Sequence, residues 1–254
     1  MLVLINSTVN QAGVSTLARS IAYTYSNWVN RPVLIVSIKS DRYYKAKGNI
    51  KPEYGSKFLS IVNGNTGGHG DLKAYTYKIN ELLFYYQAHS SPAASKTQHE
   101  LELDTFLERA SREFGVVILD LDNETNSIKR FLDIADICLT VLPPDRMVVE
   151  DAYLDIQEVL EDYREEGGLA VKTKMCYIIN KSLRVGLSKA EAAKILKAAP
   201  KDVFTVPYDP RIINEGNANK YTTFLADVIL HKKAPEDKVL EVSLKRLYDV
   251  LKKL

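Results

Sequence analysis

The sequence has few of the features that mark a secreted, metal-binding or membrane-spanning protein. It contains two cysteines, Cys138 and Cys176, each within an apolar run, so we expect two buried thiols rather than a disulfide. No Cys and His residues are spaced as metal ligands, which argues against a site built for a metal alone. His69, His89 and His99 are expected in loops, as solvated side chains.

Long apolar stretches and excess charge are also missing. No apolar run is long enough to span a bilayer, and no basic segment followed by an apolar stretch begins the sequence. We therefore expect a cytoplasmic protein, with peripheral membrane association as an alternative. The chain has 34 Lys and Arg against 32 Asp and Glu, so no global field attracts DNA, and DNA is not an expected partner.

The first residues of the chain are arranged as in a phosphate-binding loop. Residues 1–6 are apolar and predict a buried strand, residues 7–16 predict a polar loop, and the spacing of apolar residues predicts a helix over 17–28. A strand, a loop and a helix in this order present free backbone N–H groups at the helix N-terminus, where an anion can bind.

The chemistry of this loop is incomplete. The phosphate-binding pattern is Gly-x-x-x-x-Gly-Lys-Ser/Thr, and Gly13, Ser15 and Thr16 match its later positions. Thr8 stands at the first glycine and Val14 at the lysine, and a valine cannot neutralise phosphate charge. Two interpretations remain: a nucleotide-binding loop that has lost its lysine, or an ordinary strand-to-helix connection with one glycine.

Strands and helices alternate along the rest of the chain. This predicts an α/β fold, with a mostly parallel twisted sheet covered by helices on both faces, in a single domain over 1–254. The expected strands are 32–38, 82–86, 116–120, 137–142, 175–181 and 203–207. The expected helices are 71–78, 100–112, 126–134, 147–166, a helix capped by Ser188, 213–230 and 236–254, with a surface loop over 87–98.

Several polar residues follow predicted strands. In a parallel sheet the carboxyl ends of the strands share one edge, so the 7–16 loop, Lys39, Asp120 and Asn180 should gather there. Asp120 ends the most apolar strand, where an α/β sheet can hold Mg²⁺. The alternative is that Asp120 is only a strand-end turn residue or a helix cap.

The order and spacing of these pieces resemble the ParA/MinD family of deviant Walker-A ATPases. The family loop reads Lys-Gly-Gly-x-Gly-Lys-Thr-Thr, and residues 9–16 occupy those positions with Val9 and Val14 in place of both lysines. The second family strand ends Asp-x-Asp, whereas this chain has Ser37-Ile38-Lys39. The strand over 114–120 resembles the family's Walker B segment. The segment over 206–210 resembles the family segment that lies beside the nucleotide base.

The resemblance implies a P-loop fold and a vestigial nucleotide site. Its candidate residues are Gly13, Val14, Ser15, Thr16, Lys39, Asp120, Asn180, Pro207 and Asp209. Ser15 and Asp120 would hold Mg²⁺ if a nucleotide binds, so the cofactor is either ATP with Mg²⁺ or none. The loss of one key electrostatic group typically costs about 10² to 10³ in rate. We therefore expect no hydrolysis at family rates.

By analogy with the family, we expect a non-hydrolysing scaffold or positioning factor of a pilus, secretion, conjugation or plasmid system, resembling TadZ-type proteins. It would bind protein partners and form a homodimer. The alternative is a slow ATPase with an atypical loop that cycles between monomer and ATP-bound dimer.

Two local hypotheses complete the sequence analysis. Lys39 could pair with Asp120 or Asp122 and replace a metal ion, or it could be a solvated surface group. The helix over 236–254 is amphipathic, with one face of leucines and several lysines elsewhere. Packing on the sheet is expected, and weak binding to a membrane surface is the alternative.

Overall fold

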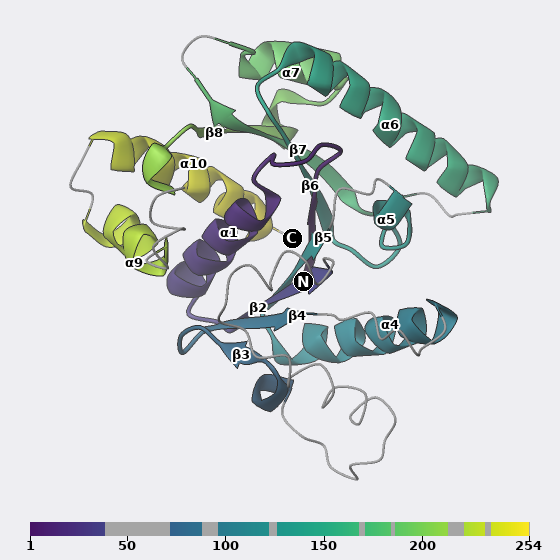
Figure 1. Ribbon diagram of the computed structural model, residues 1–254, viewed down its shortest axis with the longest axis vertical. Coiled ribbons are helices and arrows are strands. Elements are labelled where there is room, and N and C mark those ends of the chain that lie inside the picture. The colour runs from purple at the N-terminus through teal and green to yellow at the C-terminus, as the bar shows by residue number, and fades with distance from the viewer. Residues whose placement is uncertain are drawn as a thin grey trace.

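A computed structural model describes residues 1–38, 72–87, 96–121, 126–167, 171–183, 186–212, 221–231 and 235–253. Within these residues one sheet of eight strands runs in the order β3-β4-β2-β5-β1-β6-β7-β8 (Figure 1). The strands are β1 (Leu2–Asn6), β2 (Val33–Ile38), β3 (Tyr77–Lys78), β4 (Leu83–Gln87), β5 (Val116–Leu121), β6 (Ile137–Leu142), β7 (Lys174–Ser182) and β8 (Val203–Pro207). All neighbouring strands pair in parallel except β3, which pairs antiparallel with β4 at one edge.

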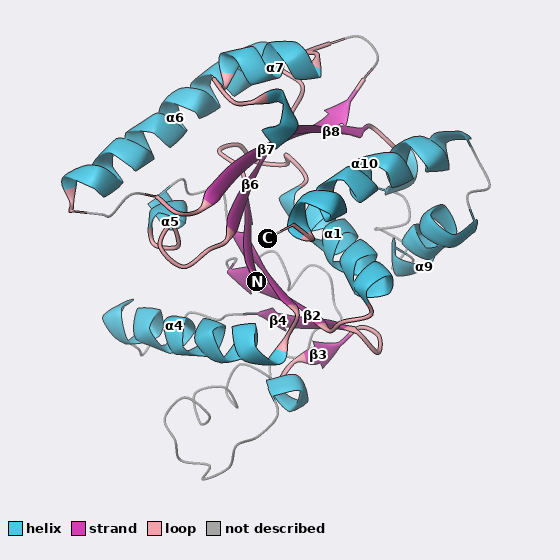
Figure 2. Cartoon of the chain, turned by 180° about the vertical axis from the view of Figure 1, so that it is seen from behind, coloured by secondary structure: helices cyan, strands magenta, loops and turns pink. Residues whose placement is uncertain are grey.

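Helices cover both faces of this sheet (Figure 2). The helices are α1 (Val14–Val29), α4 (Lys96–Glu113), α5 (Asn126–Lys129), α6 (Arg146–Glu165), α7 (Lys189–Ile195), α9 (Tyr221–Ala226) and α10 (Pro235–Leu251). Residues of α1, α9 and α10 share one apolar core with one face of the sheet. The opposite face packs on α4 and α5 in a second core, and on α6 and α7 in a third. The predicted fold class is therefore confirmed.

The pattern of apolar residues explains the layering. β1, β5 and β6 are buried along their whole length, because each lies between two strands and under helices on both faces. The thiols of Cys138 and Cys176 are buried and free, as expected, and burial raises the pKa of each to about 12. Within the described residues no helix is long and apolar enough to cross a bilayer.

Several predicted boundaries are wrong. Helix α1 begins at Val14, three residues earlier than expected, so Ser15 and Thr16 belong to its first turn. Residues 72–78 form a 3-10 helix (Leu72–Tyr75) and then β3, not one α-helix. Residues 77 and 78 pair antiparallel with β4, and this tertiary contact decides the local structure there.

Two further helices also differ from their predicted extent. Helix α4 begins at Lys96, so His99 lies in a helix rather than in the predicted loop. Helix α5 ends at Lys129 and turns continue the chain, whereas a helix over 126–134 was expected. Residues 213–220 lie outside the described residues, and α9 is followed by a π-helix, Asp227–His231.

Helix α10 packs against α1 and β8. Its leucines Leu240, Leu244, Leu247 and Leu251 are at most 2% exposed. Tyr248 of α10 also contacts Trp28 of α1, with ring centroids 4.9 Å apart. This face of the helix is therefore part of the core, as expected from the sequence.

We expect Leu244→Ala to lower the free energy of unfolding by about 2–5 kcal/mol, because truncation of a buried leucine leaves a cavity. Val239→Ala on the same helix should change it by less than about 0.5 kcal/mol, since Val239 is 55% exposed. Urea denaturation followed by circular dichroism measures both changes. Equal, small effects would show that α10 does not pack on the sheet in solution.

Candidate functional site

The loop between β1 and α1 lies at the carboxyl end of the sheet, between its central strands. β1 pairs with β5 and β6, so the loop leaves the sheet with strands on both sides. The N–H of Leu17 donates to the carbonyl of Gly13 at 2.9 Å, which starts the helix immediately after the loop. The dipole of α1 makes this end of the helix electropositive.

Gly13 is required by two separate features of its surroundings. Its φ of 95° lies in the left-handed region, which an L-residue with a side chain rarely adopts. A Cβ at this position would also lie 2.4 Å from the amide nitrogen of Asn180. The loop therefore approaches the end of β7 as closely as a backbone without a side chain allows.

The end of β7 holds the loop through two consecutive side chains. Nδ2 of Asn180 donates to the carbonyl of Ala12 at 2.7 Å, and Asn180 is 7% exposed. Nζ of Lys181 donates to the carbonyl of Gln11 at 2.8 Å. We call these two bonds the β7 clasp.

A backbone irregularity aims Lys181 at the loop. The register between β7 and β8 shifts between Ile179 and Ser182, and Lys181 has a left-handed φ of 55°. A bulge of this kind redirects a side chain that a regular strand would place on the other face. Lys181 was not among the predicted site residues; its position after Asn180 was visible in the sequence, but the bulge was not.

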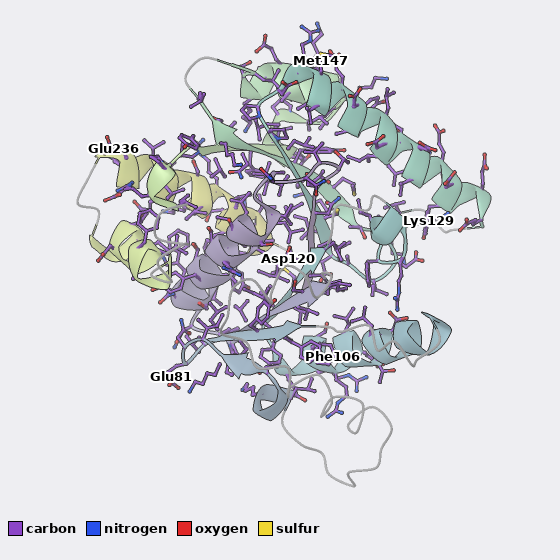
Figure 3. All side chains as sticks on the ribbon, in the orientation of Figure 1. Glu81, Phe106, Asp120, Lys129, Met147 and Glu236 are labelled. Carbon is purple, nitrogen blue, oxygen red and sulfur yellow. The ribbon has the colours of Figure 1, made fainter. Side chains whose placement is uncertain are left out.

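Asp120 lies in the same neighbourhood, as predicted. It is 2% exposed and pairs in register with Ile5 of β1 on one side and Ser37 of β2 on the other. Figure 3 shows Asp120 near the centre of the molecule. Ser15, the other predicted Mg²⁺ ligand, is 8% exposed in the first turn of α1. The topology therefore brings the loop, Asp120 and Asn180 to one edge of the sheet.

The two valines of the loop, Val9 and Val14, pack in or against the apolar core. Val14 is 4% exposed and belongs to the cluster that includes α1 and α10, and Val9 packs against the same cluster. Their side chains therefore add apolar surface to the loop rather than charge.

Two polar groups at the base of the loop are buried without a hydrogen-bond partner among the described residues. They are Nδ2 of Asn6 and Oγ1 of Thr8. Oδ1 of Asn6 accepts from Oγ1 of Thr140 at 3.1 Å, which fixes the orientation of the amide. Buried donors of this kind are normally satisfied by water or a ligand.

Asp209 makes contacts that the sequence did not suggest. Its carboxylate accepts hydrogen bonds from Nε and a terminal nitrogen of Arg211, at 2.9 and 2.6 Å. The other terminal nitrogen of Arg211 donates to Asp237 of α10 at 2.7 Å. These two carboxylates raise the pKa of Arg211. Arg211 thus ties the segment after β8 to α10, and Pro207 is the last residue of β8.

Lys39 and Asp122 lie outside the described residues, so their proposed ion pair remains a hypothesis. The expected neighbourhood of their strands is confirmed, because Ser37 pairs with Asp120 and Ile38 with Leu121.

Known structures with the same architecture cover almost the whole chain. A ParA family ATPase from Chlorobium tepidum TLS matches 97% of this chain and 98% of its own, at 16% identity and a TM-score of 0.69. A putative plasmid partition protein from Borrelia burgdorferi B31, bound to AMPPNP, matches 100% and 99%, at 16% identity and a TM-score of 0.67. MinD in the MinC:MinD complex of Aquifex aeolicus matches 98% and 96%, at 15% identity and a TM-score of 0.64.

No protein-family model matches the chain, and no curated protein does. At these identities the structural matches define the fold, which is the P-loop α/β fold of the ParA/MinD ATPases.

A double-mutant cycle tests the contact between Gly13 and Asn180. Gly13→Ala should destabilise the protein by more than the roughly 1–2 kcal/mol expected for a left-handed alanine, because the new Cβ also meets the Asn180 amide. In an Asn180→Ala background the same change should cost at least about 1 kcal/mol less, since the clash is gone. Chemical denaturation of the four proteins gives this coupling energy, and a coupling near zero would contradict the close approach.

Proposed function

We propose that the protein is a divergent relative of the ParA/MinD ATPases that acts as a non-hydrolysing scaffold or positioning factor. The observation that carries this proposal is the absence of any lysine or arginine from residues 7–16, together with the packing of Val9 and Val14 against the core. Phosphoryl transfer depends on cations placed around the β- and γ-phosphates. The loop offers none from its own residues.

The groups that remain fit an anion only in part. The N-terminus of α1, Ser15 and the buried donors of Asn6 and Thr8 could donate hydrogen bonds to a phosphate or a water. Ser15 and Asp120 are the groups that would hold Mg²⁺ beside a bound nucleotide. Lys181 is already bonded to the loop backbone, so in this arrangement it acts as a strut and not as a phosphate ligand.

The scaffold hypothesis also explains why the loop architecture persists without its cations. The β7 clasp and the packing of Val9 and Val14 against one core restrain the loop through protein groups. A surface that partner proteins recognise would then be permanently formed. One structural match is a MinC:MinD complex and others are partition proteins, which supports an assembly or positioning role by analogy.

The particular system is proposed at the same level of analogy: a pilus, secretion, conjugation or plasmid apparatus. A homodimer and protein partners are proposed as well. Weak membrane association would have to use the exposed side of α10 or another surface, because the leucine face of that helix is buried.

Calorimetric titration with ATP and Mg²⁺ tests the proposal. We expect weak or undetectable binding and phosphate release at the background rate, because the loop lacks its cations. Ser15→Ala is the matched variant, since it removes one hydroxyl from the first turn of α1 and should leave both readouts unchanged. Tight binding with phosphate release that Ser15→Ala abolishes would establish the slow ATPase instead.

The two functions also differ in how self-association responds to nucleotide. We expect the sedimentation coefficient of the protein to be the same with and without ATP and Mg²⁺, because the scaffold does not need a nucleotide to form its surfaces. Sedimentation velocity over a range of protein concentrations measures this. A shift from monomer to dimer on addition of ATP would favour the cycling ATPase.

A further inference from the structure

A groove lies along the outer edge of the sheet, outside the site described above. It has a volume of about 450 Å³ and runs beside β8, with residues of α7 and α10 on its walls. Figure 1 shows β8 between these two helices, which cover opposite faces of the sheet. The groove begins near Lys174, the first residue of β7, six positions and roughly 20 Å before Asn180.

The groove is strongly basic compared with the rest of the chain. Five cationic and two acidic side chains line it, an excess of three positive charges, whereas the whole chain carries a net charge of only +2. One of the two acids, Asp202, lies 3.6 Å from Nζ of Lys174 and is partly neutralised by it. Lys201, Arg246 and Lys253 form no ion pair within the described residues, and all three are exposed.

An edge strand, β8, contributes Phe204 and Thr205 to the lining of the groove. Among the residues that the structure describes, β8 is the last strand in the sheet order and pairs only with β7. In an edge strand, alternate peptide groups point away from the sheet, and another extended chain can pair with them. Phe204 and Val250 add apolar surface inside the groove, and Nζ of Lys189 lies 5.8 Å from the centre of the Phe204 ring.

From this combination we propose that the edge of β8 is a docking site for an extended acidic segment of a partner protein, which adds to the sheet as a further strand. Backbone pairing with β8 supplies the register, and acidic side chains meet Lys201, Arg246 and Lys253. Side chains of the segment that lie on the α10 face of the sheet would contact Phe204 and Val250.

The observations favour a peptide over a nucleic acid. Asp202 and Asp249 lie within the groove and would repel a phosphate backbone, whereas a peptide can place a neutral residue beside each. The groove is also short, since β8 has five residues, and it offers an edge strand rather than a long basic stripe. This proposal concerns a separate surface and does not depend on whether a nucleotide binds near Gly13.

The test is a fluorescence-polarisation titration of the intact protein with a labelled acidic strand-forming peptide, acetyl-EVEVDVEV-amide. We expect saturable binding that weakens about tenfold or more in the Arg246→Glu/Lys253→Glu variant, because both groups line the groove. The matched control is Lys245→Glu/Lys252→Glu. It makes the same change in charge at exposed positions of the same C-terminal segment that do not line the groove, and it should bind as the unmodified protein does.

A second peptide separates strand pairing from simple charge attraction. The same sequence with alternate backbone nitrogens methylated keeps its charge but cannot complete the ladder, and we expect it to lose at least tenfold in affinity. Equal weakening by the two double variants, equal binding of the methylated peptide, or no binding at all would overturn the proposal. Tighter binding of a 24-base-pair DNA duplex that displaces the peptide would also overturn it.

Discussion

The arrangement of the site depends on the contact between the loop after β1 and the end of β7. Two side chains of β7, Asn180 and Lys181, donate to consecutive loop carbonyls, and the next residue of the loop is a glycine with no room for a Cβ. This contact joins segments separated by almost 170 positions in the chain. Because it fixes the loop backbone, it also fixes where α1 begins.

The same contact explains how a loop without lysine or arginine keeps its shape. In a phosphate-binding loop, part of the stabilisation comes from the ligand that the backbone N–H groups surround. Here protein groups provide a comparable restraint. The β7 clasp holds the loop on one side, and Val9 and Val14 anchor it in the core on the other. A cationic loop in the absence of its ligand would have neither apolar anchor.

The central site around Gly13 and the proposed docking edge at β8 occupy different parts of one sheet for a physical reason. A parallel sheet gathers its loops at the carboxyl ends of the strands, and the central strands bring Asp120 and Gly13 to that edge. The lateral edge of the sheet is different, because it offers unpaired peptide groups instead of side chains. Charge around β8 therefore acts together with the backbone, whereas the central site depends on individual side chains.

Much of the fold could be predicted from local sequence because the buried strands are unusually apolar. The bounds of β6 and β8 are those expected from their apolar runs, and Ser188 with Glu191 forms the expected capping box. Predictions failed where tertiary contacts decide the local structure. Helix α1 begins earlier than expected because Gly13 is its N-cap. Residues 72–78 form a 3-10 helix and an edge strand because β3 pairs with β4.

The sequence by itself determined the layered α/β architecture and the absence of lysine and arginine from residues 7–16, since both follow from residue types in their order. Only the tertiary structure decided which groups meet. Lys181 reaches the loop through a bulge in β7, and Asp209 pairs with Arg211, which also donates to Asp237. Such pairings depend on strand register and on packing between distant segments, which local periodicity does not encode.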